Sequence, residues 1–186
     1  KIIRTFPVYM SSTAMQIMPD NKTLVGTTYH RRDKGGKQVM DSVTEAYSIT
    51  TGKKIPVPAM HDSCHGKKSI LQQLKLSDRY LGAWCSNGTA WLFDVKNFSL
   101  VRNLDKAEGL YLNRDGSLAA VWGGLRGQFK ILDTTTWKEM ETPPGFAAGG
   151  LAIAFGPENS LLKAWSNCLE EYAILKGKKI IHVQEK

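Results

Sequence analysis

The sequence predicts an all-β protein built from about four similar units of roughly 40 residues. The first observation is a short phrase ending in tryptophan that occurs three times, with Trp84, Trp122 and Trp165 lying 38 and 43 residues apart. The second is the period-two alternation of apolar and polar residues within each unit, which is typical of β-strands. The third is the lack of a convincing 3.6-residue amphipathic pattern, so we expect no helix.

Each unit is predicted to contain four antiparallel strands joined by polar turns. We expect strands at 12–18, 23–31, 43–49 and 54–59 in the first unit, at 70–76, 80–86, 89–95 and 100–104 in the second, at 109–114, 118–124, 128–134 and 137–142 in the third, and at 150–156, 161–167, 170–176 and 179–184 in the fourth. Four strands in about 40 residues make one blade of a β-propeller. We expect the three repeated tryptophans to pack between blades rather than to bind a ligand.

The units form one continuous propeller region, 1–186. We expect a seventeenth strand at Ile2 to Tyr9, although the last unit has an outer strand of its own, so that 1–10 would complete another blade. The chain is then part of a larger propeller, continuous with further blades or domains. A closed four-bladed ring is the less favoured alternative. The four expected blades are 11–60, 61–105, 106–143 and 144–186.

The third strands share a further pattern. It is Trp91-Leu-Phe-Asp-Val95 in the second unit and Phe129-Lys-Ile-Leu-Asp133 in the third, each followed by a polar turn. An aromatic-aliphatic strand that ends in Asp before a turn resembles the WD40-type β-propeller repeat in a degenerate form. Asp94 and Asp133 match the Asp position of that family. No third strand ends in Trp-Asp and no unit opens with Gly-His, so the family's His/Ser/Asp hydrogen-bond network is not expected here.

The composition narrows the class of partner. Lys and Arg number 25 against 17 Asp and Glu, and the net charge of +8 favours acidic partners. No apolar run approaches the roughly 18 residues of a membrane-spanning helix, so we expect no membrane span. Three cysteines do not make a disulfide framework, and we expect reduced thiols and a cytoplasmic location. Asn-x-Ser/Thr sequons at Asn21, Asn87 and Asn97 argue weakly for secretion instead.

The candidate binding site is a set of basic residues in predicted loops. In a WD40-like blade, the loop between strands two and three and the loop leading to the next blade lie on the same face. Such a rim would attract acidic peptides, phosphates or a nucleic-acid backbone. A solvated hairpin is the alternative, and neighbouring aspartates would dilute the field. The predicted binding residues are Arg31, Arg32, Lys34, Lys37, Lys67, Lys68 and Arg126.

No constellation of residues nominates a catalytic site, a metal site or a cofactor. His61, Cys64 and His65 lack the second Cys/His pair that structural zinc needs. The glycine-rich stretches 123–127 and 148–150 open no predicted helix, which a phosphate-binding loop of the dinucleotide or P-loop kind requires. We therefore expect no enzyme, although further blades of an intact protein could supply catalytic groups.

Together these observations predict a non-enzymatic scaffold for protein–protein interaction that docks partners through propeller loops. Arg31, Arg32, Lys34 and Lys37 are the expected electrostatic contacts, and the expected partner is an acidic protein. The alternative function is binding of nucleic acid or a phospho-ligand through the same basic face. Steep salt dependence would distinguish nucleic-acid binding from apolar docking.

Overall fold

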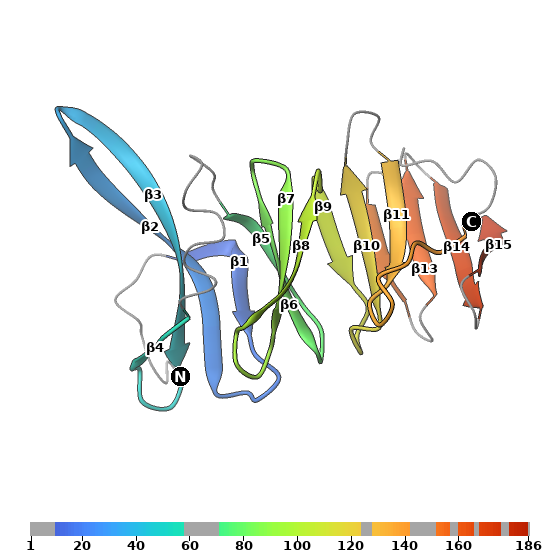
Figure 1. The fold of residues 1–186 in the computed structure, drawn as a ribbon, viewed down its shortest axis with the longest axis horizontal. Helices are drawn as coiled ribbons and strands as arrows, with labels where there is room; N and C mark the ends of the chain where they lie inside the picture. The colour runs from blue at the N-terminus through green and yellow to red at the C-terminus, as the bar shows by residue number, and fades with distance from the viewer. Residues whose placement is uncertain are drawn as a thin grey trace.

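The computed structural model describes residues 10–57, 71–123, 128–141, 152–156, 160–165, 168–175 and 179–185. In these residues the chain forms strands and no helix. Three sheets have four strands and one has three, and neighbouring strands pair antiparallel. The predicted all-β fold of four-stranded blades is confirmed. Figure 1 shows the four sheets side by side in chain order.

We call the sheets blades 1 to 4 in chain order. Blade 1 contains β1 (Met10–Ile17), β2 (Thr23–Lys34), β3 (Lys37–Ser48) and β4 (Lys54–Ile55). Blade 2 contains β5 (Leu71–Leu76), β6 (Tyr80–Cys85), β7 (Thr89–Asp94) and β8 (Leu100–Asp105). Blade 3 contains β9 (Gly109–Leu112), β10 (Leu118–Gly123) and β11 (Gln128–Asp133). Blade 4 contains β12 (Ala152–Phe155), β13 (Leu161–Trp165), β14 (Cys168–Leu175) and β15 (Lys179–Glu185).

Short polar side chains close the tight turns between strands. The Asp20 carboxylate accepts hydrogen bonds from the backbone N–H groups of Lys22 (2.8 Å) and Thr23 (2.9 Å) in the turn after β1. Asp94 accepts from Lys96 N–H at 2.8 Å, and Asp133 from Thr135 N–H at 2.8 Å. Asp side chains favour turns because they can replace a backbone acceptor in this way. The two aspartates that match the repeat pattern therefore fix the turns after β7 and β11.

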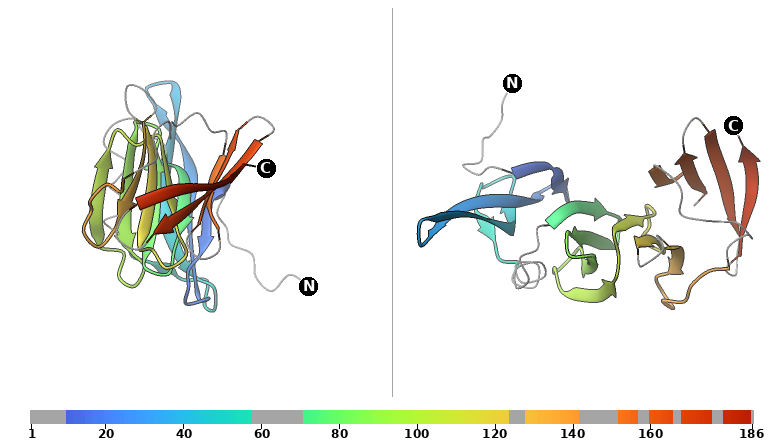
Figure 2. Two further views of the ribbon diagram at one scale, coloured as in Figure 1. Left: turned by 90° about the vertical axis from the view of Figure 1, so that its right-hand side faces the viewer. Right: turned by 90° about the horizontal axis from the view of Figure 1, so that it is seen from above.

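The core lies between the blades. Successive residues of a strand face opposite sides, so a central blade packs on both faces. In blade 2, Leu81 and Phe93 pack against blade 1 in a cluster that includes Val25. Leu92 of the same blade packs toward blade 3 in a cluster with Leu110. Figure 2 shows the result from above, where the four sheets stand in an open arc with blades 1 and 4 at its two ends.

The repeated tryptophans do not all share one environment. Trp84 is partly buried between blades 2 and 3, as expected, and its indole N–H donates to the Ala107 carbonyl at 2.8 Å. Trp122 is 38% exposed, so the prediction that it packs between blades is wrong. The segment between β8 and β9, which contains Ala107, covers Trp84. Trp122 lies near the end of β10, and among the described residues no segment covers it in the same way. The side chain of Trp165 lies outside the described part.

Several strands differ from their predicted lengths; β4, expected at 54–59, ends at Ile55. The expected outer strand of blade 3 at 137–142 is reduced to isolated bridges, one of which joins Leu132 and Glu139. It follows Trp137, whose φ of 58° interrupts extended backbone. The hairpin of blade 1 is longer than predicted, because strand pairing continues to Lys34 and Lys37. The expected additional strand at residues 2–9 lies outside the described residues. In the part described, no helix is long and apolar enough to cross a membrane.

Candidate functional site

The outer halves of β2 and β3 form a two-stranded arm that extends beyond the rest of blade 1 (Figure 1). The two strands pair continuously from Thr23 opposite Ser48 to Lys34 opposite Lys37. The neighbouring strand β1 pairs with β2 only as far as Thr28, and β4 pairs with β3 only at 46–47. Within the described chain, residues 29–42 therefore pair only with one another, and we call them the arm.

A two-residue turn closes the tip of the arm. Gly35 and Gly36 have φ values of 61° and 79°, and a turn with positive φ at both central residues matches the twist of a hairpin. The Asp33 carboxylate accepts a hydrogen bond from Gly36 N–H at 2.8 Å. The Gly-Gly pair was predicted to lie in a loop flanked by basic residues. In the structure it is the turn of a continuous ladder, so the basic residues lie on strands.

Four of the seven predicted binding residues lie on the arm. Arg31 is opposite Met40, Arg32 is opposite Val39, and Lys34 is opposite Lys37. With Asp33 and Asp41, the arm has four basic and two acidic residues, a formal charge of +2. The positions of Lys67, Lys68 and Arg126 lie outside the described residues, as do those of His61, Cys64 and His65. A common basic rim that includes them stays a prediction.

A buried polar network lies at the base of the arm. The side chain of Glu45 is 8% exposed. Its Oε2 accepts hydrogen bonds from the Thr28 hydroxyl at 3.0 Å and the Tyr47 hydroxyl at 2.9 Å. Its Oε1 forms an ion pair with Lys54 Nζ at 2.5 Å. Sequence analysis missed this network; the one available signal was the Glu45–Tyr47 spacing, which places both side chains on one face of β3.

The network shifts the pKa values of its members. Burial raises the pKa of Glu45, but the hydrogen bonds from Lys54, Tyr47 and Thr28 and the charge of Lys54 outweigh it, and the pKa lies below its ordinary value. Burial and the hydrogen bond to Glu45 raise the pKa of Tyr47 to about 12. An ionised Glu45 and a protonated Tyr47 are thus held together at neutral pH. This arrangement stabilises the base of the arm and is poorly suited to proton transfer near neutral pH.

Two further predictions concern cysteine and metal chemistry. Cys85 is disulfide-bonded and fully buried, so the expectation of reduced thiols is wrong for this residue. The sequence spacing of three cysteines could not show which of them meet in the fold. Among the described side chains, no group of three or more His, Cys, Asp or Glu residues could hold a metal ion.

Comparison with known proteins gives the fold and no assigned activity. No protein-family model matches the chain, and no curated protein matches it. The β-propeller domain of Myceliophteria thermophila Cps50 (Swd1) matches all of the chain with a TM-score of 0.66 and 16% identity. A HIRA structure matches 92% of the chain (TM-score 0.51, 11% identity), and the computationally designed Ika8 protein matches 94% (0.58, 15%).

The chain spans 57%, 54% and 61% of these three structures, respectively. At these sequence identities, the matches are evidence for the fold alone. They agree with the repeat period, the four-stranded sheets and the aromatic-aliphatic strands that end in Asp94 and Asp133. The repeats, the four-stranded sheets and these matched structures together show that the chain has a β-propeller fold.

Proposed function

We propose that this propeller is a non-enzymatic interaction scaffold that docks an acidic protein partner through the arm. The observation that carries the proposal is the position of the arm, which places four basic residues beyond the body of blade 1 on a paired backbone (Figure 1). Propeller blades suit this role because a fixed scaffold holds variable connections in defined positions.

The electrostatics of the arm favour a partner with clustered carboxylates. Arg and Lys bind carboxylates through charge-assisted hydrogen bonds, and Arg can do so with two parallel bonds. The Asp33 carboxylate is held in the turn by Gly36 N–H. The Glu45 carboxylate, the next acidic group on β3 after Asp41, is buried and paired with Lys54. With four basic residues against Asp33 and Asp41, the arm has a formal charge of +2, which favours an acidic partner.

The test is a pull-down from lysate with the intact protein, read by mass spectrometry. Arg31, Arg32, Lys34 and Lys37 are changed together to Glu. The matched control changes four exposed lysines in turns at the other end of the blades, Lys22, Lys53, Lys96 and Lys138, to Glu. We expect the arm variant to lose a partner that the wild type and the control variant retain.

The same samples are treated with nuclease, which separates the two binding classes. A partner that is retained after nuclease treatment and lost in the arm variant supports protein docking. Capture that disappears with nuclease in the wild type assigns the basic face to nucleic acid instead. An identical set of captured proteins in wild type and arm variant would overturn the proposal, because the arm would then be only a solvated hairpin.

A further inference from the structure

A second surface, distinct from the arm, lies between blades 2 and 3. It is a cavity of about 410 Å³, which we call the inter-blade groove. One wall is the outer strand of blade 2, and the other is formed by two strands of blade 3. It is lined by Arg102, Asn103, Leu104, Asp105, Lys106, Val121, Gly123, Lys130 and Leu132.

The end of the groove is shaped by a close backbone approach. Gly123 ends β10 with a φ of 152°, and a Cβ atom there would lie 2.2 Å from the Lys106 carbonyl oxygen. The link from β8 to β9 therefore lies directly against the end of β10. Two backbone hydrogen bonds hold this link, from Glu108 N–H to the Trp122 carbonyl (2.5 Å) and from Ala107 N–H to the Gly88 carbonyl (2.7 Å). Lys106 is thus fixed in a left-handed conformation beside the groove.

The groove combines aliphatic and basic side chains. Leu104, Val121 and Leu132 line it and are each partly buried. Around them lie three exposed cations, Arg102, Lys106 and Lys130, and one carboxylate, Asp105.

Among the described residues, one of the three cations has an ion pair. Lys130 forms an ion pair with Glu139 at 2.8 Å. Arg102 stands over the Trp137 ring, 5.2 Å from its centre, and neither Arg102 nor Lys106 has an ion pair within the described residues. The groove therefore carries surplus positive charge beside an apolar surface.

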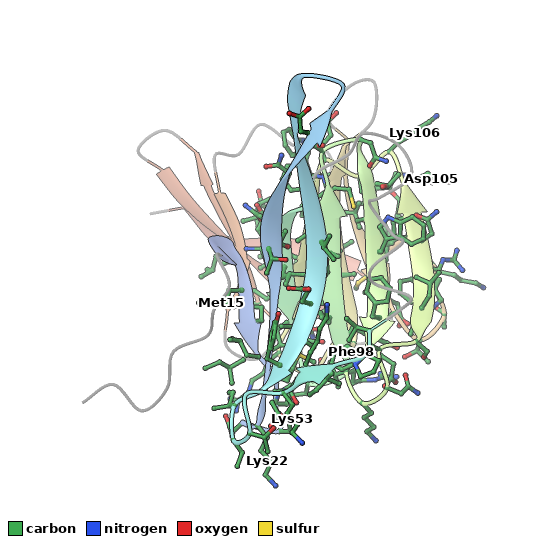
Figure 3. The ribbon with its side chains drawn as sticks, turned by 90° about the vertical axis from the view of Figure 1, so that its left-hand side faces the viewer. Met15, Lys22, Lys53, Phe98, Asp105 and Lys106 are labelled. Atoms are coloured by element: carbon green, nitrogen blue, oxygen red, sulfur yellow. The ribbon has the colours of Figure 1, made fainter. Side chains whose placement is uncertain are left out.

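The open edge of blade 2 adds main-chain groups to this surface. In the described sheet, β8 is the edge strand and pairs only with β7. An extended peptide can add to such an edge through backbone hydrogen bonds, while its alternate side chains enter neighbouring pockets. Figure 3 places Asp105 and Lys106 at the end where the arm rises, far from Lys22, Lys53 and Phe98.

We propose that the inter-blade groove binds a short extended peptide segment that carries acidic side chains and at least one aliphatic side chain. The aliphatic side chain would contact Leu104, Val121 and Leu132, and the flanking carboxylates would meet Arg102 and Lys106. Its volume lies within the range of small binding pockets, so it accommodates a few side chains rather than a folded surface. This site is separate from the arm and does not depend on the function proposed for the arm.

The test measures fluorescence anisotropy of a labelled peptide of alternating Glu and Leu with the intact protein. Two further peptides, Glu alternating with Ser and Lys alternating with Leu, test the need for the aliphatic and acidic side chains. The groove variant is Arg102→Glu with Lys106→Glu. The matched control is Arg114→Glu with Lys138→Glu, two exposed residues in turns at the other end of blade 3.

We expect the Glu-Leu peptide to bind at least about tenfold more weakly to the groove variant and unchanged to the control variant. The Glu-Ser and Lys-Leu peptides should bind weakly to the wild type. Val121→Ser should weaken binding of the Glu-Leu peptide more than binding of the Glu-Ser peptide. Thermal unfolding of each variant checks that the variant is folded. Equal binding by groove variant and wild type would overturn the inference. If only the Glu variant of the arm lost binding, the peptide would be assigned to the arm, and the arm proposal would stand without the groove.

Discussion

Glu45 shows how a single residue connects the arm to the blade. Its carboxylate is almost enclosed, and three donors from β2, β3 and β4 satisfy it: Thr28, Tyr47 and Lys54. A buried carboxylate without such donors would be costly, and donors left without the carboxylate are costly too. The network therefore ties together three strands of blade 1 at the point where the arm begins.

Removing this carboxylate should destabilise the protein measurably. We expect Glu45→Ala to lower the free energy of unfolding by about 2 kcal/mol, because Thr28 and Tyr47 lose a buried acceptor while Lys54 remains largely solvated. Urea unfolding measures the change. Glu139→Ala is the control: its ion pair with Lys130 is about half exposed on both sides, and its loss should cost at most about 0.5 kcal/mol. Equal effects would contradict a structural role for the network.

The same residue predicts a dependence of stability on pH. The folded-state pKa of Glu45 lies below the ordinary value of 4.5. The stability that ionised Glu45 contributes to the folded state is therefore fully present above pH 4.5. It is lost as the pH falls through the lower folded-state pKa. Turn hydrogen bonds also lower the pKa values of Asp20 and Asp115 against the opposing effect of burial, so they act in the same direction. Glu45→Gln should flatten, but not abolish, the acid-side slope in urea unfolding measured across this range.

The close backbone approach at Gly123 gives a further prediction about a single residue. We expect Gly123→Ala to cost about 3 kcal/mol, since its Cβ would collide with the backbone at Lys106 and Glu108. Gly88→Ala is the matched control, with a positive φ of 76° but nothing within 4 Å of the added Cβ, and it should cost about 1 kcal/mol. Thermal unfolding compares the two. If both cost the same, the close approach beside the groove would not be structurally important.

At the scale of elements, the arm is separable from its blade. Residues 29–42 pair only with one another among the described strands, so their removal should leave the inter-blade core intact. We expect a protein in which Arg31–Met40 is replaced by Asn-Gly to keep its melting temperature within a few degrees, because whole cross-strand pairs are removed and register is preserved. Circular dichroism during heating measures this. A large fall in melting temperature would show that the arm supports the blade.

Most elements could be predicted from the sequence because short apolar strands alternate with polar turns; in blade 2 the central strand β6 is buried along nearly all of its length. The expected strands at 80–86 and 89–95 differ from β6 and β7 by one residue at the C-terminal end. The arm was predicted as a loop because charged residues around Gly35 and Gly36 do not alternate with apolar ones. Backbone pairing does not require that alternation once a tight turn brings the strands together.

The sites were harder to predict than the strands. The basic residues of the arm could be found from local charge, because all four lie within seven positions, 31–37. The groove could not: Leu104, Val121 and Leu132 come from three strands in two blades, and they meet only when the blades pack. The exposure of Trp122 has the same origin, since the repeat predicts its position in the strand but not which part of the next link covers it.

At the scale of the whole molecule, stability resides in the packing of each blade on its neighbour. Phe93 is fully buried between blades 1 and 2, whereas Leu100 in the same blade is 46% exposed. We expect Phe93→Ala to cost about 3–5 kcal/mol through the cavity it leaves. Leu100→Ala should cost less than about 1 kcal/mol. Urea unfolding of both variants tests this, and similar losses would place the main stabilising contacts elsewhere.

The strand pairing is unbroken from Thr23 and Ser48 to Lys34 and Lys37. The arm is therefore a direct extension of two strands whose other ends lie inside blade 1. The same ladder includes the pair Val25 and Ala46, which packs against blade 2. The base of the arm is therefore fixed beside the next blade. Because its strands are already paired, the arm would lose less backbone freedom on binding than a loop that has to become ordered first. Shortening or lengthening the ladder by whole pairs would change the reach of the scaffold while leaving its anchorage unchanged.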